Sequence, residues 1–545
     1  SLEEKIIADV TPDNASYPAF DSYDKLIEMK DIYPDIDYMG GFSMKGAKFL
    51  GSGNKLQDAI LKIYRGDTLY LTCRSKIYVF KKDLVVGRNT AVYFKLRNDS
   101  LYHPGLLFKY IVKDREVTLI RDGDPQSMSL SPYFNTFHKI DMDFEQLTWP
   151  IDKDEIKMGA MKGSIVNKAK FESANYFRES RYNEIQLADE LHPLVALRRY
   201  AEKIQSEEFY ADEFADFLVK DITQVRQMCL GLSFKGLIDY NSSSEKIKLK
   251  QRLYDYLKAR VGKIDYDVIK FDSEHDMIGL ENAALKISTL DLKLYGVQKI
   301  QVSDSQNVII FPRGRQLTVQ KNRNFKFDGI IEAGLFTFFG QEFDFNYEKF
   351  KIDLKNIDSL KIKVESFEAD EYGQKQLLDI QNVIENITGD LLIDDPNNKS
   401  SVKHFPQYPI FNSNQPSFVY YDYPYTQDGV YNREKFYFAV DPYTVDSLNS
   451  FTTEGLNFDG EFVSADILPS FREKLTVQRD YSLGFTRYTP PEGYPVYKGA
   501  GTFIDTINLS NFGLVGKGTI NYLNTTTKSD KFIFLPDSMN GIAKT

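Results

Sequence analysis

The sequence predicts a multidomain α+β protein that is dominated by β-structure, with stacked β units, sandwich-like or solenoid-like, around one helical module. Three observations lead to this class. The chain has 545 residues, too many for one small core, so several domains are expected. Aromatic residues make up 14% of it, and aromatic side chains favour strands. Alternating apolar runs lie on both sides of 192–261, where the apolar residues instead follow helical spacing.

The stretch 192–261 predicts a winged-helix-like module. Pro193 suits the first turn of a helix, because its missing N–H has no partner to lose there. Asp221 is a good N-cap for a third helix. The run 237–240 is predicted to be a strand, and 246–250 alternates as the returning wing strand. Three helices, two strands and a closing helix are the expected order of a winged helix.

DNA binding is one function that a winged helix suggests, with the third helix in the major groove. Between 192 and 252 there are 10 Lys and Arg against 9 Asp and Glu, a net charge of +1. DNA affinity depends mainly on neutralising phosphates, so this balance disfavours nucleic acid as a partner. The only basic run is the wing, whose contact candidates are Lys246, Lys248, Lys250 and Arg252.

Changes in composition divide the chain into six segments. Short helices are also expected at 23–29 and at 379–387. The segments are 1–39, an N-terminal approach segment; 40–163, a β domain; 164–262, a helical lead with the winged-helix-like module; 263–387, a β domain with a Phe-Asp-Gly repeat; 388–435, an aromatic and proline-rich connector; and 436–545, a C-terminal β domain.

An internal repeat supports stacked β units. Phe327-Asp328-Gly329 and Phe458-Asp459-Gly460 open two similar blocks, and a shorter echo relates 499–503 to 516–520. Glycine at a fixed place in successive β units is what stacked strands need at tight corners. These few copies fit a solenoid and serial sandwiches equally well.

Motifs for catalysis and cofactors are missing from the sequence. It contains no phosphate-binding loop, no HExxH zinc motif and no nucleophile elbow, so no catalytic residue and no cofactor site is predicted. The run Asp394-Asp395-Pro396-Asn397-Asn398 offers oxygen ligands that Ca²⁺ could use. It lacks the spacing of an EF-hand loop, and a solvated turn is the favoured interpretation.

The aromatic series 405–438 raises a glycan-binding alternative. Tyr420, Tyr421 and Tyr423 are its contact candidates, because aromatic ring faces can stack on sugars. Burial of these rings against a sheet is the favoured interpretation, since aromatic side chains bury large areas. A carbohydrate-binding or polysaccharide-processing protein is therefore the first alternative function, and a winged-helix DNA-binding protein is the second.

Charge and hydropathy restrict the partners and the locations that are expected for the protein. The net charge of −10 disfavours nonspecific binding to nucleic acids or anionic membranes. Apolar runs of about 18 residues are lacking, so no transmembrane helix is expected. The first residue is Ser and the last β unit looks incomplete. We therefore expect a fragment of a longer chain, with any targeting segment outside this sequence.

Several short sequence motifs resemble those of a known group of proteins. They are Ser303-Asp304-Ser305-Gln306-Asn307-Val308, Phe327-Asp328-Gly329, Ala333-Gly334, Phe339-Gly340, Tyr481-Ser482-Leu483-Gly484-Phe485, Pro490-Pro491-Glu492-Gly493 and Gly499-Ala500-Gly501. Over about 177–540 the chain resembles large uncharacterised envelope or secreted proteins of Gram-negative bacteria. The resemblance implies an exported, β-rich, mostly non-catalytic protein and brings no functional residues. The expected function is a structural or protein-interaction component of a bacterial envelope or secreted assembly, with a protein or a glycan as partner.

Overall fold

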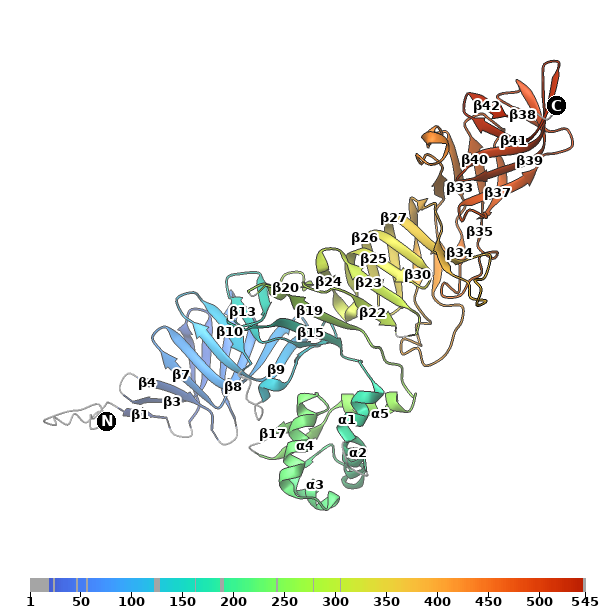
Figure 1. The fold of residues 1–545 in the computed structure, drawn as a ribbon. Coiled ribbons are helices and arrows are strands. Elements are labelled where there is room, and N and C mark those ends of the chain that lie inside the picture. The colour runs from blue at the N-terminus through green and yellow to red at the C-terminus, as the bar shows by residue number, and fades with distance from the viewer. Residues whose placement is uncertain are drawn as a thin grey trace. The chain divides into compact units, whose positions relative to one another are not determined.

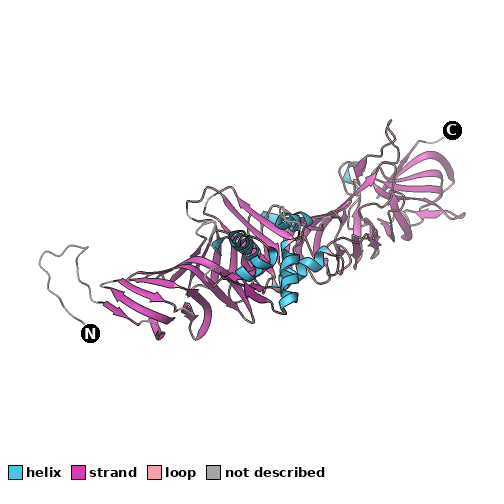
Figure 2. Ribbon diagram, turned by 90° about the horizontal axis from the view of Figure 1, so that it is seen from below, coloured by secondary structure: helices cyan, strands magenta, loops and turns pink. Residues whose placement is uncertain are grey.

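The computed structural model describes residues 19–22, 25–45, 48–54, 57–121, 128–161, 163–186, 191–241, 244–277, 279–303 and 305–542. Of these residues 52% lie in strands and 12% in helices, so the protein is β-dominated, as the sequence predicts. The chain divides into two compact units, 1–300 with 314–325, and 301–313 with 326–545. Figure 1 and Figure 2 show that the α-helices gather in one module and that strands build most of the rest.

The N-terminal unit contains a β domain built on one long hairpin. Its strands β8 (Leu84–Leu96) and β9 (Asp99–Ile111) pair antiparallel, with register shifts near Gly87 and Thr90. Before these shifts β8 pairs with β7 (Ile77–Lys81), and beyond them it pairs with β6 (Thr68–Ser75). The hairpin therefore belongs to two series of antiparallel strands.

The two series also share β3 (Ile36–Lys45), to which β1 (Ala19–Asp21) and β2 (Ile27–Tyr33) pair as well. The first series is β3, β4 (Lys48–Ser52), β7 (Ile77–Lys81), β8, β9, β10 (Glu116–Ile120), β13 (Gln146–Pro150), β14 (Glu155–Gly159), β20 (Glu281–Lys286), β21 (Leu292–Leu294) and β24 (Leu317–Val319). The second series is β3, β5 (Ala59–Arg65), β6 (Thr68–Ser75), β8, β9, β11 (Tyr133–Asn135), β12 (Ile140–Asp143), β15 (Asn167–Ser173) and β19 (Lys270–His275).

The two series bury a common core. Phe94 belongs to the second series and Trp149, the single tryptophan, to the first; both are buried, and their ring centroids lie 5.6 Å apart. Burial alternates along β7 (Ile77–Lys81), where Tyr78 and Phe80 point into the core. Every second side chain of this strand therefore faces outward.

The helical module follows β15. Its elements are α1 (Glu179–Gln186), α2 (Pro193–Ile204), β16 (Glu208–Tyr210), α3 (Ala211–Leu218), α4 (Ile222–Phe234), β17 (Ile238–Asn241), β18 (Lys246–Leu249) and α5 (Gln251–Arg260). Pro193 begins α2, and the Asp221 carboxylate accepts a hydrogen bond from the Thr223 N–H at 2.8 Å, so both predicted helix starts are confirmed. The strands form a small antiparallel sheet in the order β16–β18–β17, here named the wing sheet. The short strand β16 was not predicted.

Replacing Gly231 with alanine is expected to raise the free energy of unfolding by about 0.5 to 1 kcal/mol. Gly231 lies inside α4, and a Cβ added there would meet no atom within 4 Å. Alanine loses less conformational freedom than glycine on entering a helix. Urea unfolding followed by the helical circular-dichroism signal measures the change. Gly236→Ala is the opposing control, because its Cβ would lie 2.6 Å from the Phe134 ring. A loss of stability in Gly231→Ala would contradict the prediction.

The C-terminal unit is built on a second long pair of strands. β26 (Phe336–Asn346) and β27 (Lys351–Glu365) pair across a register shift at Phe339 and Gly340. The first part of β27 pairs with β30 (Ile387–Leu392), and its later part pairs with β28 (Leu377–Asp379) and β29 (Ile384–Glu385). β23 (Val308–Pro312) and β25 (Phe325–Ala333) form a further antiparallel pair. The short strand β22 (Ile300–Ser303) precedes β23.

Two series of strands extend from β27. One is β27, β30 (Ile387–Leu392), β31 (Ile410–Ser413) and β34 (Thr444–Val445). The other is β27, β29 (Ile384–Glu385), β32 (Ser417–Tyr420), β33 (Phe436–Val440), β35 (Asn457–Ser464), β36 (Phe471–Val477), β37 (Leu483–Tyr488), β39 (Gly501–Ser510), β40 (Gly513–Tyr522), β41 (Thr525–Leu535) and β42 (Ser538–Gly541). β28 (Leu377–Asp379) adds to β27, and β38 (Tyr494–Val496) adds to β39.

In both Phe-Asp-Gly repeats the glycine lies close to a carbonyl oxygen of the neighbouring strand. A Cβ on Gly329 would lie 2.2 Å from the carbonyl oxygen of Phe311, on the neighbouring strand β23. A Cβ on Gly460 would lie 2.2 Å from the carbonyl oxygen of Ala439, on the neighbouring strand β33. The glycine of each repeat therefore permits a close backbone approach between paired strands. Neither glycine lies at the tight corner that was predicted, because both are inside strands, β25 and β35.

Two predicted helices are wrong. Residues 27–29 of the expected helix 23–29 begin strand β2, while Tyr23 and Asp24 lie outside the described residues. The expected helix 379–387 is replaced by the end of β28 and by β29, because Ile384 lies between β27 and β32 and pairs with both. Pairing with distant strands overrides the local pattern in each case.

Candidate functional site

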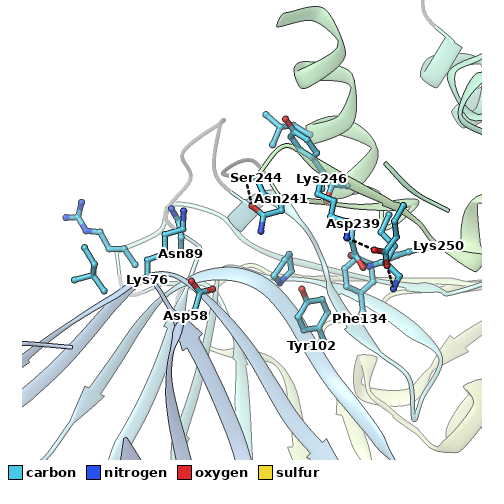
Figure 3. Close-up of a pocket in the computed structure, with 18 of the residues that line it drawn as sticks. Asp58, Lys76, Asn89, Tyr102, Phe134, Asp239, Asn241, Ser244, Lys246 and Lys250 are labelled. Atoms are coloured by element: carbon cyan, nitrogen blue, oxygen red, sulfur yellow. Dashed lines mark hydrogen bonds and ion pairs between the residues drawn. The ribbon is translucent and has the colours of Figure 1, made fainter. Parts of the chain in front are cut away.

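A cavity of about 810 Å³ lies between the wing sheet and the outer face of the β domain. Both walls belong to the N-terminal unit. We call this cavity the wing cleft. Figure 3 shows Tyr102 and Phe134 near one of its ends, and Asp58, Lys76 and Asn89 near the other. Its size is within the range of ligand-binding pockets, generally about 300 to 1,000 Å³.

The wall formed by the β domain is apolar. Ile77 and Val79 of β7 and Val86 of β8 line it, and Val79 and Val86 face each other across the two strands. Their neighbours Tyr78 and Phe80 point into the core, so the alternation of β7 turns Ile77 and Val79 outward. Ile77 is 56% exposed. The sheet therefore presents aliphatic side chains to the cleft instead of the polar ones usual on an outer face.

Stacked aromatic rings close one end of this wall. Tyr93, Tyr102 and Phe134 are direct cross-strand neighbours on β8, β9 and β11. The Tyr93 and Tyr102 ring centroids are 4.4 Å apart, and those of Tyr102 and Phe134 are 6.3 Å apart. The Lys250 ammonium lies 5.4 Å from the centroid of Phe134. Burial raises the pKa of Tyr102 well above its usual range. These ring faces already contact one another and a cation, so they form no flat platform for a sugar.

The opposite wall is the charged outer face of the wing sheet. Glu208 of β16 lies between two lysines of β18, with its carboxylate oxygens 2.6 Å from the Lys246 ammonium and 2.8 Å from that of Lys248. Hydrogen bonds from both lysines lower the pKa of Glu208 to about 2. Lys250 pairs with Asp239 of β17 at 2.5 Å. The three lysines predicted as wing contacts therefore line one wall together, and each has an acidic partner.

Arg252, the fourth predicted wing contact, attaches the module to the β domain instead. Its guanidinium lies 2.5 Å from the carboxylate of Asp141 on β12, and both side chains are largely buried. Burial raises the pKa of Asp141, and the nearby Arg252 partly offsets that rise. A second contact joins Arg181 of α1 to Glu172 of β15 at 2.9 Å. Two buried ion pairs thus hold the helical module against the domain that carries the apolar wall.

The candidate glycan contacts do not form a joint surface. Tyr421 is fully buried, and its hydroxyl donates to the Leu483 carbonyl at 2.9 Å, so it is unavailable to a ligand in this structure. Arg433 lies over the Tyr420 ring, 4.6 Å from its centroid. Tyr423 stacks on Tyr425 with centroids 5.0 Å apart. Burial of this series against the sheet was the favoured interpretation of the sequence.

The acidic run that was considered for Ca²⁺ organises its own loop. Asp394 is buried, and its carboxylate accepts hydrogen bonds from Gln306, Asn398 and Ser401 at 3.0 to 3.2 Å. Its other oxygen accepts from the Asp395 N–H at 2.7 Å. Among the residues that the structure describes, no group of three or more His, Cys, Asp or Glu side chains is placed to hold a metal ion.

Two of the five histidines have structural surroundings. His103 and His138 are buried, and burial lowers their pKa values to about 3 and about 4, so both are neutral at physiological pH. Each ring contacts a backbone carbonyl, that of Ser131 for His103 at 2.9 Å and that of Leu290 for His138 at 2.8 Å.

Within the described ranges, no helix has both the length and the apolar character needed to cross a membrane.

The apolar wall is a feature that was not predicted from the sequence. The run 77–80 is apolar at four successive positions, and that pattern signals a strand with both faces covered or one with an apolar outer face. Its position under the wing depends on contacts between distant residues such as Asp141 and Arg252.

No protein-family model, no curated protein and no solved structure matched the chain.

Proposed function

We propose that this chain is a non-catalytic structural and protein-interaction component of a bacterial envelope or secreted assembly. In this proposal the β units, stacked as the repeat suggests, form a scaffold. The helical module acts as a winged-helix-like protein-contact module. The chain would be a fragment of a longer exported protein, in keeping with its resemblance to large Gram-negative envelope and secreted proteins.

The observation that carries this proposal is the wing cleft. Exposed aliphatic side chains on the outer face of a sheet are unusual in a soluble domain and typical of a surface that meets a partner. Each wing cation considered for DNA has a carboxylate of the same chain within 2.8 Å. Contact with phosphates would require these pairs to separate. The geometry therefore favours protein contact over DNA binding.

The native protein is expected in a stable complex outside the cytoplasm. Fractionation with protease accessibility on intact cells measures its location, and cross-linking followed by size-exclusion chromatography measures its assembly state. A cytoplasmic, monomeric native protein would overturn the proposal. The purified chain is also expected to show no salt-sensitive binding to a DNA duplex. Saturable duplex binding that Lys246→Glu with Lys248→Glu abolishes would favour the DNA alternative instead.

A further inference from the structure

We propose that the wing cleft binds an extended, amphipathic peptide strand whose polar face is acidic. This inference rests on the proposed function, since it names the partner chemistry of the same surface. Its first support is the contrast between the two walls. Ile77, Val79 and Val86 form an aliphatic wall, whereas Glu208 and Lys248 belong to the charged wall opposite. A β-strand projects successive side chains to opposite faces, so an alternating peptide meets each wall with matching side chains.

The charge of the cleft determines the sign of the polar face. Its lining residues include five cations and three carboxylates, a net of +2, in a chain whose net charge is −10. Arg88, on the β-domain side, has no ion-pair partner among the residues that the structure describes. Lys246, Lys248 and Lys250 keep their pairs with Glu208 and Asp239 in this proposal. Acidic side chains on the peptide would gain from the net positive charge of the cleft and from Arg88 without separating those pairs. The cations are Lys76, Arg88, Lys246, Lys248 and Lys250, and the carboxylates are Asp58, Glu208 and Asp239.

An apolar small molecule fits the cleft less well than a peptide. An acyl chain or another apolar ligand would take the ion pairs of Glu208 with Lys246 and Lys248 out of water and offer no further hydrogen bonds to them, and such desolvation of ion pairs is costly. A peptide strand supplies carboxylates and main-chain groups on that side while it still covers Val79 and Val86. The walls together therefore specify a polymer that is polar on one face only.

The test uses the purified chain and synthetic fluorescein-labelled peptides of about eight residues, somewhat longer than a typical strand. One peptide alternates Val and Glu, a second has the same composition in two blocks, and a third alternates Val and Lys. Fluorescence anisotropy is expected to show saturable binding of the first peptide. Binding of each of the other two is expected to be at least about tenfold weaker.

Variants in the wall locate the binding. Arg88→Glu and Val79→Asp are expected to weaken binding of the alternating Val-Glu peptide by about tenfold. Lys95→Glu is the matched control, because Lys95 is exposed on the same strand β8 and does not line the cleft, so its affinity is expected to be unchanged. The fluorescence of the buried Trp149, measured for each variant, verifies that the β domain is folded.

Three results would overturn the inference. They are no saturable binding of the Val-Glu peptide, equal binding of the block isomer, and binding of a free fatty acid in place of the peptide. If none of the peptides binds while the native protein still occurs in an extracytoplasmic complex, the inference fails and the proposed function stands. A monomeric cytoplasmic protein would remove the proposed function whatever the peptides do.

Discussion

Replacing Arg323 with alanine is expected to lower the free energy of unfolding of the N-terminal unit by about 3 to 5 kcal/mol. Arg323 ends the short 3₁₀ turn Lys321–Arg323 and is 5% exposed, and Asp267 is fully buried beside it. Its guanidinium lies 3.3 Å from the Asp267 carboxylate and 3.1 Å from the Ser173 hydroxyl, which itself donates to Asp267 at 2.7 Å. Without Arg323, a buried carboxylate loses this counter-charge.

Urea unfolding followed by Trp149 fluorescence measures this loss. Trp149 is the single tryptophan of the chain and lies in the N-terminal unit, so its signal reports that unit. Arg315→Ala is the matched control, because Arg315 is half exposed and lies 3.8 Å from the exposed Asp276. Such a pair is expected to contribute less than about 1 kcal/mol. If Arg323→Ala and Arg315→Ala lowered the free energy of unfolding equally, burial of the ion pair would not explain the loss of stability.

The double variant Arg323→Ala with Asp267→Asn separates two explanations. If the cost of Arg323→Ala comes from the uncompensated charge, then neutralising Asp267 should restore part of the stability. If the cost comes from lost packing of the arginine stem, the double variant should be no better than Arg323→Ala.

Replacing Gly329 with alanine is expected to destabilise the C-terminal unit by about 2 to 3 kcal/mol. Its φ angle is +147°, and the new Cβ would lie 2.2 Å from the Phe311 carbonyl oxygen and 2.9 Å from the Arg313 nitrogen. Both close atoms are backbone atoms, so the whole pair β23–β25 has to separate to admit a methyl group. Gly460→Ala tests the second copy of the repeat, since its Cβ faces a carbonyl oxygen at the same distance.

Hydrogen exchange measured by mass spectrometry locates this effect, because weakened strands exchange their amide protons faster. In Gly329→Ala the loss of protection is expected in β23 and β25. Gly373→Ala is the control, because Gly373 also has a positive φ, +77°, yet a Cβ there would meet no atom within 4 Å. Its cost is expected to be about 1 kcal/mol, from backbone strain alone. If Gly373→Ala lost as much stability as Gly329→Ala, the destabilisation would come from the positive φ angle and not from the closeness of the neighbouring strand.

Features set by neighbouring residues could be predicted from the sequence. Pro193 and Asp221 mark helix starts because a missing N–H and a capping carboxylate act within one turn. The Phe-Asp-Gly repeat was visible in the sequence, but its glycines lie inside strands against a neighbouring carbonyl oxygen and not at the tight corners predicted for them. β-dominance followed from aromatic content and from alternation, which reflect many residues at once.

Features set by distant residues could not be predicted. The pattern of 23–29 is compatible with a helix, and pairing with β3 makes its second part a strand. Tyr420, Tyr421 and Tyr423 are alike in sequence, and the fold buries only Tyr421 completely. The wing lysines form a basic run in sequence, whereas the fold places Glu208 and Asp239 beside them. The wing cleft itself depends on how one domain packs against another.

The hairpin β8–β9 makes the N-terminal β domain a single cooperative unit. Because both of its strands pair with neighbours in each of the two series, neither series can detach while the hairpin stays folded. Loss of the hairpin, in turn, opens the core that holds Phe94 and Trp149 from both sides at once. The domain should therefore behave as one foldon, with amide protection that disappears in both series at the same denaturant concentration. This sharing of strands therefore disfavours partial unfolding that would leave one sheet exposed and ready to aggregate.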